Sequence, residues 1–155
     1  MKDRMTFEDE LVRYGRFVYT NQGRSMMPML RENRDLLIVE SIPQNDNSMK
    51  MRCHKFDVVL YKRGERYIIH RILKVLPDGY IICGDNNWRR EYDIDDTKIL
   101  GKLTAFVRDG TEISVTDRKY MLYVHLWCDF YHVRAAVLWI RSVLSRIKRK
   151  IRRKR

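Results

Sequence analysis

Seven short segments rich in β-branched and aromatic residues follow one another along most of the chain. They are residues 17–21, 35–41, 56–62, 66–75, 79–84, 98–109 and 111–116. Turn sequences such as KRGE at 62–65, PDG at 77–79 and DG at 109–110 separate them and are typical of hairpins. The pattern predicts a mainly β fold, an antiparallel β domain built as a sandwich or a partial barrel.

Helical patterns flank these segments. Residues 6–14 begin at Thr6 and carry acidic side chains in the first turn, which predicts a short N-terminal helix. From Asp117 onward the pattern is again helical. We therefore expect a β domain over residues 1–116 and a helical, basic C-terminal extension over residues 117–155.

The composition is that of a globular protein in a reducing compartment. The 155 residues are 45% apolar and 34% charged, enough for one domain with a sizeable core. The first 17 residues are polar and four are acidic, which excludes a signal peptide or an anchor there. The three cysteines lack CxxC spacing and argue against a disulfide framework. Cys53-His54 and Cys83 lack the paired spacing of a metal site, so we expect no metal or cofactor.

The positive charge is concentrated at the C-terminus. The net charge is +12, but residues 141–155 hold nine basic residues and no acidic one, which leaves 12 − 9 = +3 elsewhere. Apolar residues recur among them at helical spacing: Ile140, Val143, Leu144, Ile147 and Ile151. This predicts a helix lying on an anionic membrane surface. A solvated basic tail or a nucleic-acid arm is the alternative, and nucleic acid is disfavoured because the body is only mildly basic.

Residues 120–140 are also apolar, but charged and polar side chains such as Asp129 and Arg134 interrupt them. No uncharged run reaches the ~18 residues of a membrane span. Whether the segment inserts into a membrane or packs on the domain is left open by the pattern.

Ser25 lies in the stretch GRSMMP, between a Gly-Arg pair and an apolar run that includes Pro28. A Ser at such a place is commonly the N-cap of a short helix. It is a nucleophile only where a base and a charge-stabilising pocket accompany it.

His70 is the candidate base. It lies in RYIIHRIL with apolar residues on both sides, which predicts a strand buried on both faces. Burial favours the neutral imidazole that a general base requires. The alternative is a core histidine bonded to a backbone carbonyl. Lys62 is a weaker candidate, because a lysine in a hairpin turn stays hydrated and charged.

Three motifs in this order resemble the signal peptidase I superfamily, which also holds the LexA-type self-cleaving proteases. They are SMMP (25–28), DVVLYKRGERYIIHRIL (57–73) and GDNN (84–87), with RDLLIVE (34–40) between the first two. The match runs from about Gly23 to Arg108. The common bacterial enzymes have a Lys where this chain has His70. A His at that place resembles the endoplasmic-reticulum type of signal peptidase.

The resemblance implies acyl transfer, with Ser25 as nucleophile, His70 as base and an acid to orient it. It places the acid after GDNN, at or near Glu91, and Asp93 is the nearest Asp and our candidate third catalytic residue. Asp85 and Arg71 would shape the site. Taken alone, Asp85 is typical of an Asx turn. The backbone N–H of Ser25 would form the oxyanion hole with Gly23, where relatives often carry Ser.

The resemblance also implies a peptide or precursor-protein substrate held as an extended strand. Met26, Met27 and Pro28 would line its binding site, although core packing explains the Met residues equally well. We therefore expect a serine endopeptidase that cleaves leader or signal-type peptides, cytoplasmic and peripheral on the cytoplasmic membrane. The alternatives are a specialised maturation protease, a LexA-like self-cleaving regulator, and a catalytically inactive peptide-binding module of the same fold. The regulator is disfavoured because the chain has no visible Ala-Gly scissile pair and no helix-turn-helix before Ser25.

Overall fold

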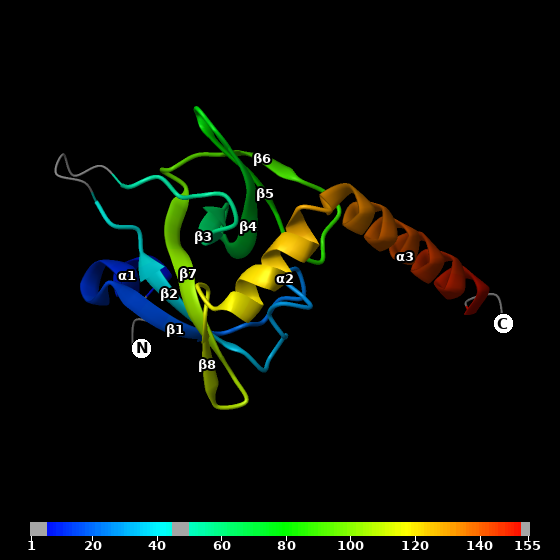
Figure 1. Ribbon diagram of the computed structural model, residues 1–155, viewed down its shortest axis with the longest axis horizontal. Helices are drawn as coiled ribbons and strands as arrows, with labels where there is room; N and C mark the ends of the chain where they lie inside the picture. The colour runs from blue at the N-terminus through cyan, green and yellow to red at the C-terminus, as the bar shows by residue number, and fades with distance from the viewer. Residues whose placement is uncertain (1–5, 45–49, 153–155) are drawn as a thin grey trace.

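The computed structural model describes residues 6–44 and 50–152, with side chains as far as residue 147. These ranges form an eight-stranded antiparallel sheet, preceded by a short helix and followed by two more (Figure 1). The predicted mainly β fold is confirmed. In chain order the elements are α1 (Phe7–Tyr14), β1 (Arg16–Thr20), β2 (Leu36–Ser41), β3 (Val58–Arg63), β4 (Arg66–Leu76), β5 (Gly79–Cys83), β6 (Glu91–Ile94), β7 (Ile99–Arg108), β8 (Thr111–Ser114), α2 (Arg118–Cys128) and α3 (Tyr131–Arg152).

The sheet has the strand order β1-β2-β7-β3-β4-β5-β6, with β8 paired to the second half of β7. The long strand β7 pairs with both β2 and β3 and so joins the two halves of the sheet. At Gly101 of β7 an added Cβ would lie 2.6 Å from the carbonyl oxygen of Glu40, so only glycine fits there. The sheet is curved, because β1 and β4 line one cleft although three strands separate them.

Strand β3 is buried on both faces and separates two apolar clusters. Val58 and Leu60 belong to one cluster, while Val59 and Tyr61 belong to the other. The neighbouring strand β4 also buries consecutive residues, from His70 to Ile72. Both faces of these strands are therefore covered at this point, as the unbroken apolar pattern around His70 predicted.

Helix α1 begins and ends as its sequence indicates. The side chains of Thr6 and Asp9 each bond the other's backbone N–H, a reciprocal capping box. The helix ends at Gly15, which has a φ of 70°. Phe7 stacks on Phe17 of β1 with ring centroids 4.7 Å apart, so the helix is held against this strand.

Strand β6 is absent from the sequence-based expectation. Its four residues, EYDI, include two acidic ones and are too few for a clear alternating pattern, so they gave no strand signal. The strand forms because β5 offers a free edge, and Ile82 pairs with Glu91 while Tyr80 pairs with Ile94.

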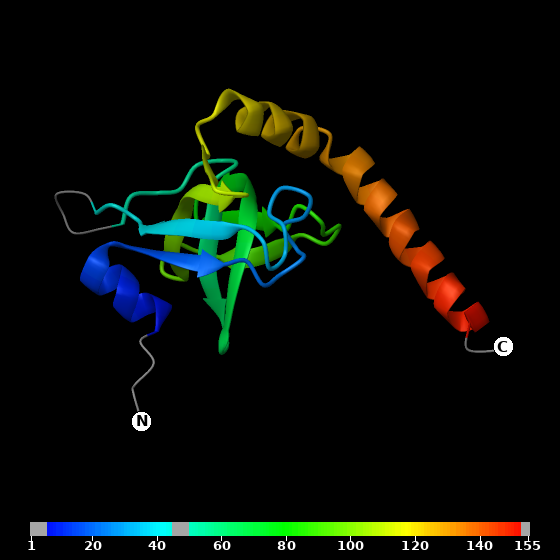
Figure 2. The same cartoon turned by 90° about the horizontal axis from the view of Figure 1, so that it is seen from below.

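The C-terminal helices differ in how they contact the body. Helix α2 buries Tyr120, Val124 and Cys128 in the first core cluster. Helix α3 contacts the body near its start and then projects away from it (Figure 2). Residues 120–140 thus pack on the domain in their first half. Across the described ranges, no helix is both long and apolar enough to cross a bilayer.

Candidate active site

Ser25 lies in the connection between β1 and β2, which is folded into turns and anchored by buried side chains. Met26 and Leu30 are buried in the core, and the Leu30 N–H donates to the Met26 carbonyl at 2.9 Å. Asp35, fully buried, accepts the Arg31 N–H at 2.8 Å and closes the connection. Ser25 caps no helix in the described structure, because the residues after it form turns. The alternative that Ser25 is a helix N-cap is therefore not met, because no helix follows it in the described residues.

The loop 84–87 lies against Ser25 from the other side. The Asn86 N–H donates to the Ser25 carbonyl at 2.7 Å, and the Asn86 side chain donates to the Arg24 carbonyl at 3.2 Å. A Cβ on Gly84 would lie 2.6 Å from the Ser25 carbonyl oxygen and 3.0 Å from Cδ2 of His70. Only glycine permits the backbone at position 84 to lie this close to both residues, so the GDNN loop contacts Ser25 and His70 together.

His70, on β4, is 5% exposed and is held at both ring nitrogens. Its Nδ1 lies 2.8 Å from Oε1 of Glu91. Its Nε2 lies 3.5 Å from the Asn87 side-chain amide. Ser25 and His70 line the same cleft, and in the described structure no hydrogen bond joins their side chains directly. Such contacts are often long in a free enzyme and shorten when substrate binds.

Glu91 is held as an anion. Its second oxygen, Oε2, accepts the Tyr61 hydroxyl at 2.5 Å and lies 2.9 Å from Nη2 of Arg63. Burial alone would raise the pKa of Glu91. The hydrogen bonds from His70 and Tyr61 and the positive charge of Arg63 outweigh it and lower the pKa to about 2. The carboxylate can thus hold a proton on Nδ1 of His70, which leaves the lone pair on Nε2, the nitrogen that the Asn87 amide approaches at 3.5 Å.

The structure does not bring Asp93 to His70. Asp93 is exposed on β6 and has a φ of 62°. Two residues along a strand are about 7 Å apart, so only one of the two acids can reach the imidazole. The acid in contact is Glu91. The Asp93 backbone carbonyl instead accepts a hydrogen bond from Lys98.

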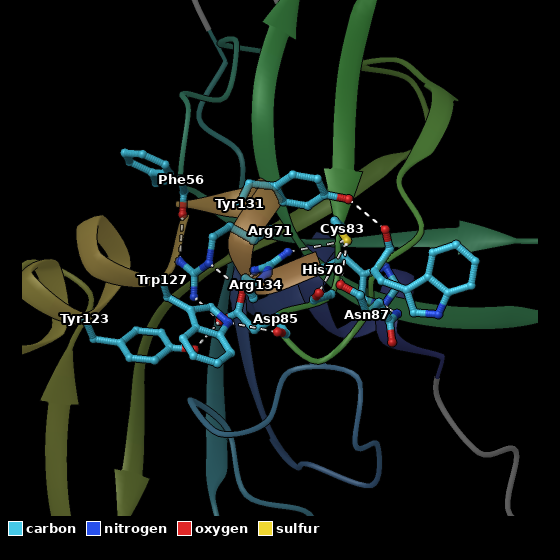
Figure 3. A network of polar contacts seen from close by, with 12 residues as sticks. Phe56, His70, Arg71, Cys83, Asp85, Asn87, Tyr123, Trp127, Tyr131 and Arg134 are labelled. Atoms are coloured by element: carbon cyan, nitrogen blue, oxygen red, sulfur yellow. Dashed lines mark hydrogen bonds and ion pairs between the residues drawn. The ribbon is translucent and has the colours of Figure 1, made fainter. Parts of the chain in front are cut away.

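Arg71 and Asp85 form a separate, fully buried ion pair next to this site (Figure 3). Nε and Nη2 of Arg71 donate to the two carboxylate oxygens at 2.9 and 2.7 Å. The Arg71 guanidinium also donates to the Tyr120 hydroxyl of α2, and the Tyr123 hydroxyl donates to Asp85. Neither charge contacts His70 among the described contacts. The pair shapes the site by holding the GDNN loop between β4 and α2.

A cleft of about 570 Å³ opens beside Ser25 and His70. Aromatic and aliphatic side chains from α1, β1, β3 and β4 line it: Phe7, Phe17, Tyr19, Leu60, Tyr67 and Ile69. Of the three residues expected to bind substrate, Met26 is at the cleft and is otherwise part of the core, whereas Met27 and Pro28 are exposed outside its lining.

The two backbone N–H groups expected to form the oxyanion hole, those of Gly23 and Ser25, differ in whether a protein group accepts them. Gly23 lines the cleft, and its N–H lies 3.4 Å from Oδ1 of Asn21, a long hydrogen bond. Among the described residues, no group accepts the N–H of Ser25. The Ser25 N–H can therefore bind an oxyanion without breaking a protein contact.

Sequence reasoning missed Tyr61 and Arg63, which complete the surroundings of Glu91. The hairpin β3–β4 pairs Val59 with His70, so Tyr61 lies on the same face two residues further on. The KRGE turn sets this register, and it was the signal that could have located Tyr61. Lys62, on the same strand, faces elsewhere: its hydrogen bond to Glu8 raises its pKa, the opposite of what a general base needs.

Together these groups provide a hydroxyl, a buried imidazole and a free N–H from residues at one apolar cleft, with an ionised carboxylate in contact with the imidazole. This is a set that nucleophilic acyl transfer requires. Comparison with known proteins adds no relative: neither a family model nor a curated protein gives a significant match to the chain.

Proposed function

We propose that the protein is a serine endopeptidase of the signal peptidase I-like kind, with Ser25 as nucleophile, His70 as general base and Glu91 as the acid that orients the base. The observation that carries the proposal is the 2.8 Å contact between Nδ1 of His70 and Glu91 at the cleft that Ser25 also lines. Glu91 replaces Asp93 in the third role, because it is the carboxylate that contacts the imidazole.

The proposed reaction follows from these positions. Oγ of Ser25 attacks the scissile carbonyl while Nε2 of His70 takes its proton. The Ser25 N–H donates to the oxyanion, and Glu91 stabilises the imidazolium. His70 then gives the proton to the leaving amine, and a water molecule, activated by the same imidazole, hydrolyses the acyl-enzyme.

The substrate proposed is a peptide segment in extended conformation. Strand β1 is at the edge of the sheet and lies on one side of the cleft, with β4 on the other. A peptide can add to such an edge through its backbone while its side chains enter the apolar cleft. A leader or signal-type peptide has this chemistry. We further propose that the enzyme works at the cytoplasmic membrane as a peripheral protein, either on such peptides in general or as a specialised maturation protease.

A second candidate function is a peptide-binding module without activity. One observation favours it: the side chains of Ser25 and His70 form no direct hydrogen bond with each other in the described structure. The same cleft would then hold a peptide without cutting it.

Quenched-fluorescent leader-type peptides, with small residues before the scissile bond, test both candidates. We expect the wild-type protein to cleave one of them and Ser25→Ala to bind it with unchanged affinity but without cleavage. Thr20→Ala, an exposed hydroxyl at the end of β1, is a matched control that should retain activity. Cleavage by Ser25→Ala would refute the nucleophile, and binding without cleavage by the wild type would support the inactive module.

A further inference from the structure

We infer that one side of α3 docks on an anionic lipid surface and so orients the domain at a membrane. The inference deepens the peripheral location proposed above and does not depend on peptidase activity. The docking side is an apolar stripe, which we call the outer stripe. It consists of Val133, Val137, Ile140, Leu144 and Ile147, which are 48–63% exposed.

The outer stripe is one continuous helical face. Its members are separated by three or four residues, so they lie one above the other along α3. The expected stripe is thereby extended toward the start of the helix. Val143, which was expected in it, lies at the edge of this face and is partly buried, and the side chain of Ile151 is outside the described part of the chain.

The opposite side of α3 is the one that contacts the body. Arg134 and Leu138 are buried, and the Tyr131 hydroxyl donates to the Trp88 carbonyl at 2.8 Å. Leu138 is two residues, or about 200°, from Ile140 around the helix. The outer stripe therefore points away from the domain, and α3 carries it beyond the sheet (Figure 2).

Charge decides which occupant fits the outer stripe. No acidic residue occurs after Asp129, and residues 141–155 hold nine basic residues. A second copy of the chain would place two such segments side by side, and they would repel. A nucleic acid would use the charges and leave five apolar side chains in water. An anionic bilayer uses both, because headgroups bind the basic residues while the apolar side chains enter the interface.

Docking through α3 would also set the position of the candidate active site. Trp127, near the end of α2, donates from Nε1 to the Asp85 carbonyl at 2.8 Å. Tyr131 and Arg134, at the start of α3, reach Trp88 and Cys83. These contacts join the helices to the loop that carries Asn86 and Asn87 beside Ser25. A membrane-bound α3 thus holds the cleft at a fixed orientation to the lipid.

Sedimentation with vesicles tests the inference on the full chain. The vesicles are phosphatidylcholine alone and phosphatidylcholine with phosphatidylglycerol. We expect binding to the anionic vesicles that weakens with salt but does not vanish. The variant Val137→Gln/Ile140→Gln/Leu144→Gln/Ile147→Gln keeps every charge. It should bind roughly 100-fold more weakly, because four apolar side chains no longer contribute burial. Replacing Arg141 and Arg146 by Gln should weaken binding about 5-fold per charge, from about 1 kcal/mol each.

The matched control is Val12→Gln, which removes an apolar side chain that is 89% exposed on α1, far from α3 in the chain. It should bind as the wild type does. Circular dichroism reports whether each variant is folded without reference to activity, which keeps this test separate from the peptidase proposal. Equal binding by the four-Gln variant, equal binding to neutral vesicles, or no vesicle binding would overturn the inference. A wild-type dimer that the four-Gln variant loses, or salt-sensitive RNA binding that it keeps, would assign α3 to the rival occupant.

Discussion

Two adjacent residues of β4, His70 and Arg71, each pair with a carboxylate, and the two pairs serve different ends. His70, which lines the cleft, meets Glu91, whose side chain is 15% exposed. Arg71 meets Asp85 where neither side chain is exposed at all. Because successive residues of a strand point to opposite faces, one residue step separates a proton-accepting pair from a structural one.

The difference lies in what the cation can do. An imidazole takes up and releases a proton near neutral pH, whereas a guanidinium stays charged. Burial alone would lower the pKa of Arg71, but the charge of the Asp85 carboxylate and its hydrogen bonds outweigh it and raise the pKa above its usual value. The Arg71–Asp85 pair is therefore a permanent brace between β4, the GDNN loop and α2.

The largest effect we expect comes from the His70 pair. Glu91→Gln should lower kcat by about 10⁴, as loss of the orienting acid does in a Ser-His-Asp triad. Asp93→Asn is the matched control, since it removes an acid two residues away on the same strand and should keep full activity. Steady-state kinetics on a cleavable leader-type peptide measures both. The reverse outcome, a slow Asp93→Asn and an active Glu91→Gln, would restore Asp93 to the third role.

Disrupting the Arg71–Asp85 pair should lower the free energy of unfolding. Asp85→Asn leaves the Arg71 charge buried without a counter-charge, which costs about 3–5 kcal/mol of the free energy of unfolding. Urea denaturation measures the loss. Asp57→Asn, at a more exposed carboxylate of the same region, should cost under 1 kcal/mol. A similar loss for both variants would contradict the distinction between the buried Arg71–Asp85 pair and the more exposed carboxylate of Asp57.

A pH series should separate the two pairs further. The pKa of Glu91 is about 2 in the folded protein, below its usual 4.5. Its contacts therefore stabilise the fold above pH 4.5, and this stabilisation is lost as the pH falls toward 2. The free energy of unfolding of the wild type should fall over this range more steeply than that of Glu91→Gln. Parallel curves for the two proteins would show that Glu91 is not held as an anion by the fold.

The smallest effect should come from Tyr61, which donates to Glu91 and lies 3.1 Å from Nδ1 of His70. Tyr61→Phe removes one charge-assisted hydrogen bond, so kcat should fall by about tenfold, from about 1.5 kcal/mol. Tyr80→Phe removes a hydrogen bond from Tyr80 to Asp96, away from the cleft, and the one that the Tyr80 hydroxyl accepts from the Cys53 N–H. Both variants should lose stability in thermal unfolding, and only Tyr61→Phe should lose activity. Equal kcat for the two would leave Tyr61 without a role in positioning Glu91.

Much of the architecture was predictable because it depends on local signals. The β-rich segments and their turns indicated seven of the strands, and Thr6 indicated the start of α1. Strand β6 was not predictable, since its EYDI sequence becomes a strand only through pairing with β5. The same strand carries Glu91, so the sequence pattern could not choose between Glu91 and Asp93.

By itself the sequence determined the fold class, the buried strand around His70 and the separation of a mildly basic body from a strongly basic end. These depend on apolar periodicity, turn chemistry and residue counts, which short stretches carry within themselves. Only the tertiary structure decided that Glu91 meets His70, that Arg71 and Asp85 brace α2, and that the apolar side of α3 faces away from the domain. These depend on strand register and on which face of a helix meets its neighbour, and a shift of one residue would have reversed each of them.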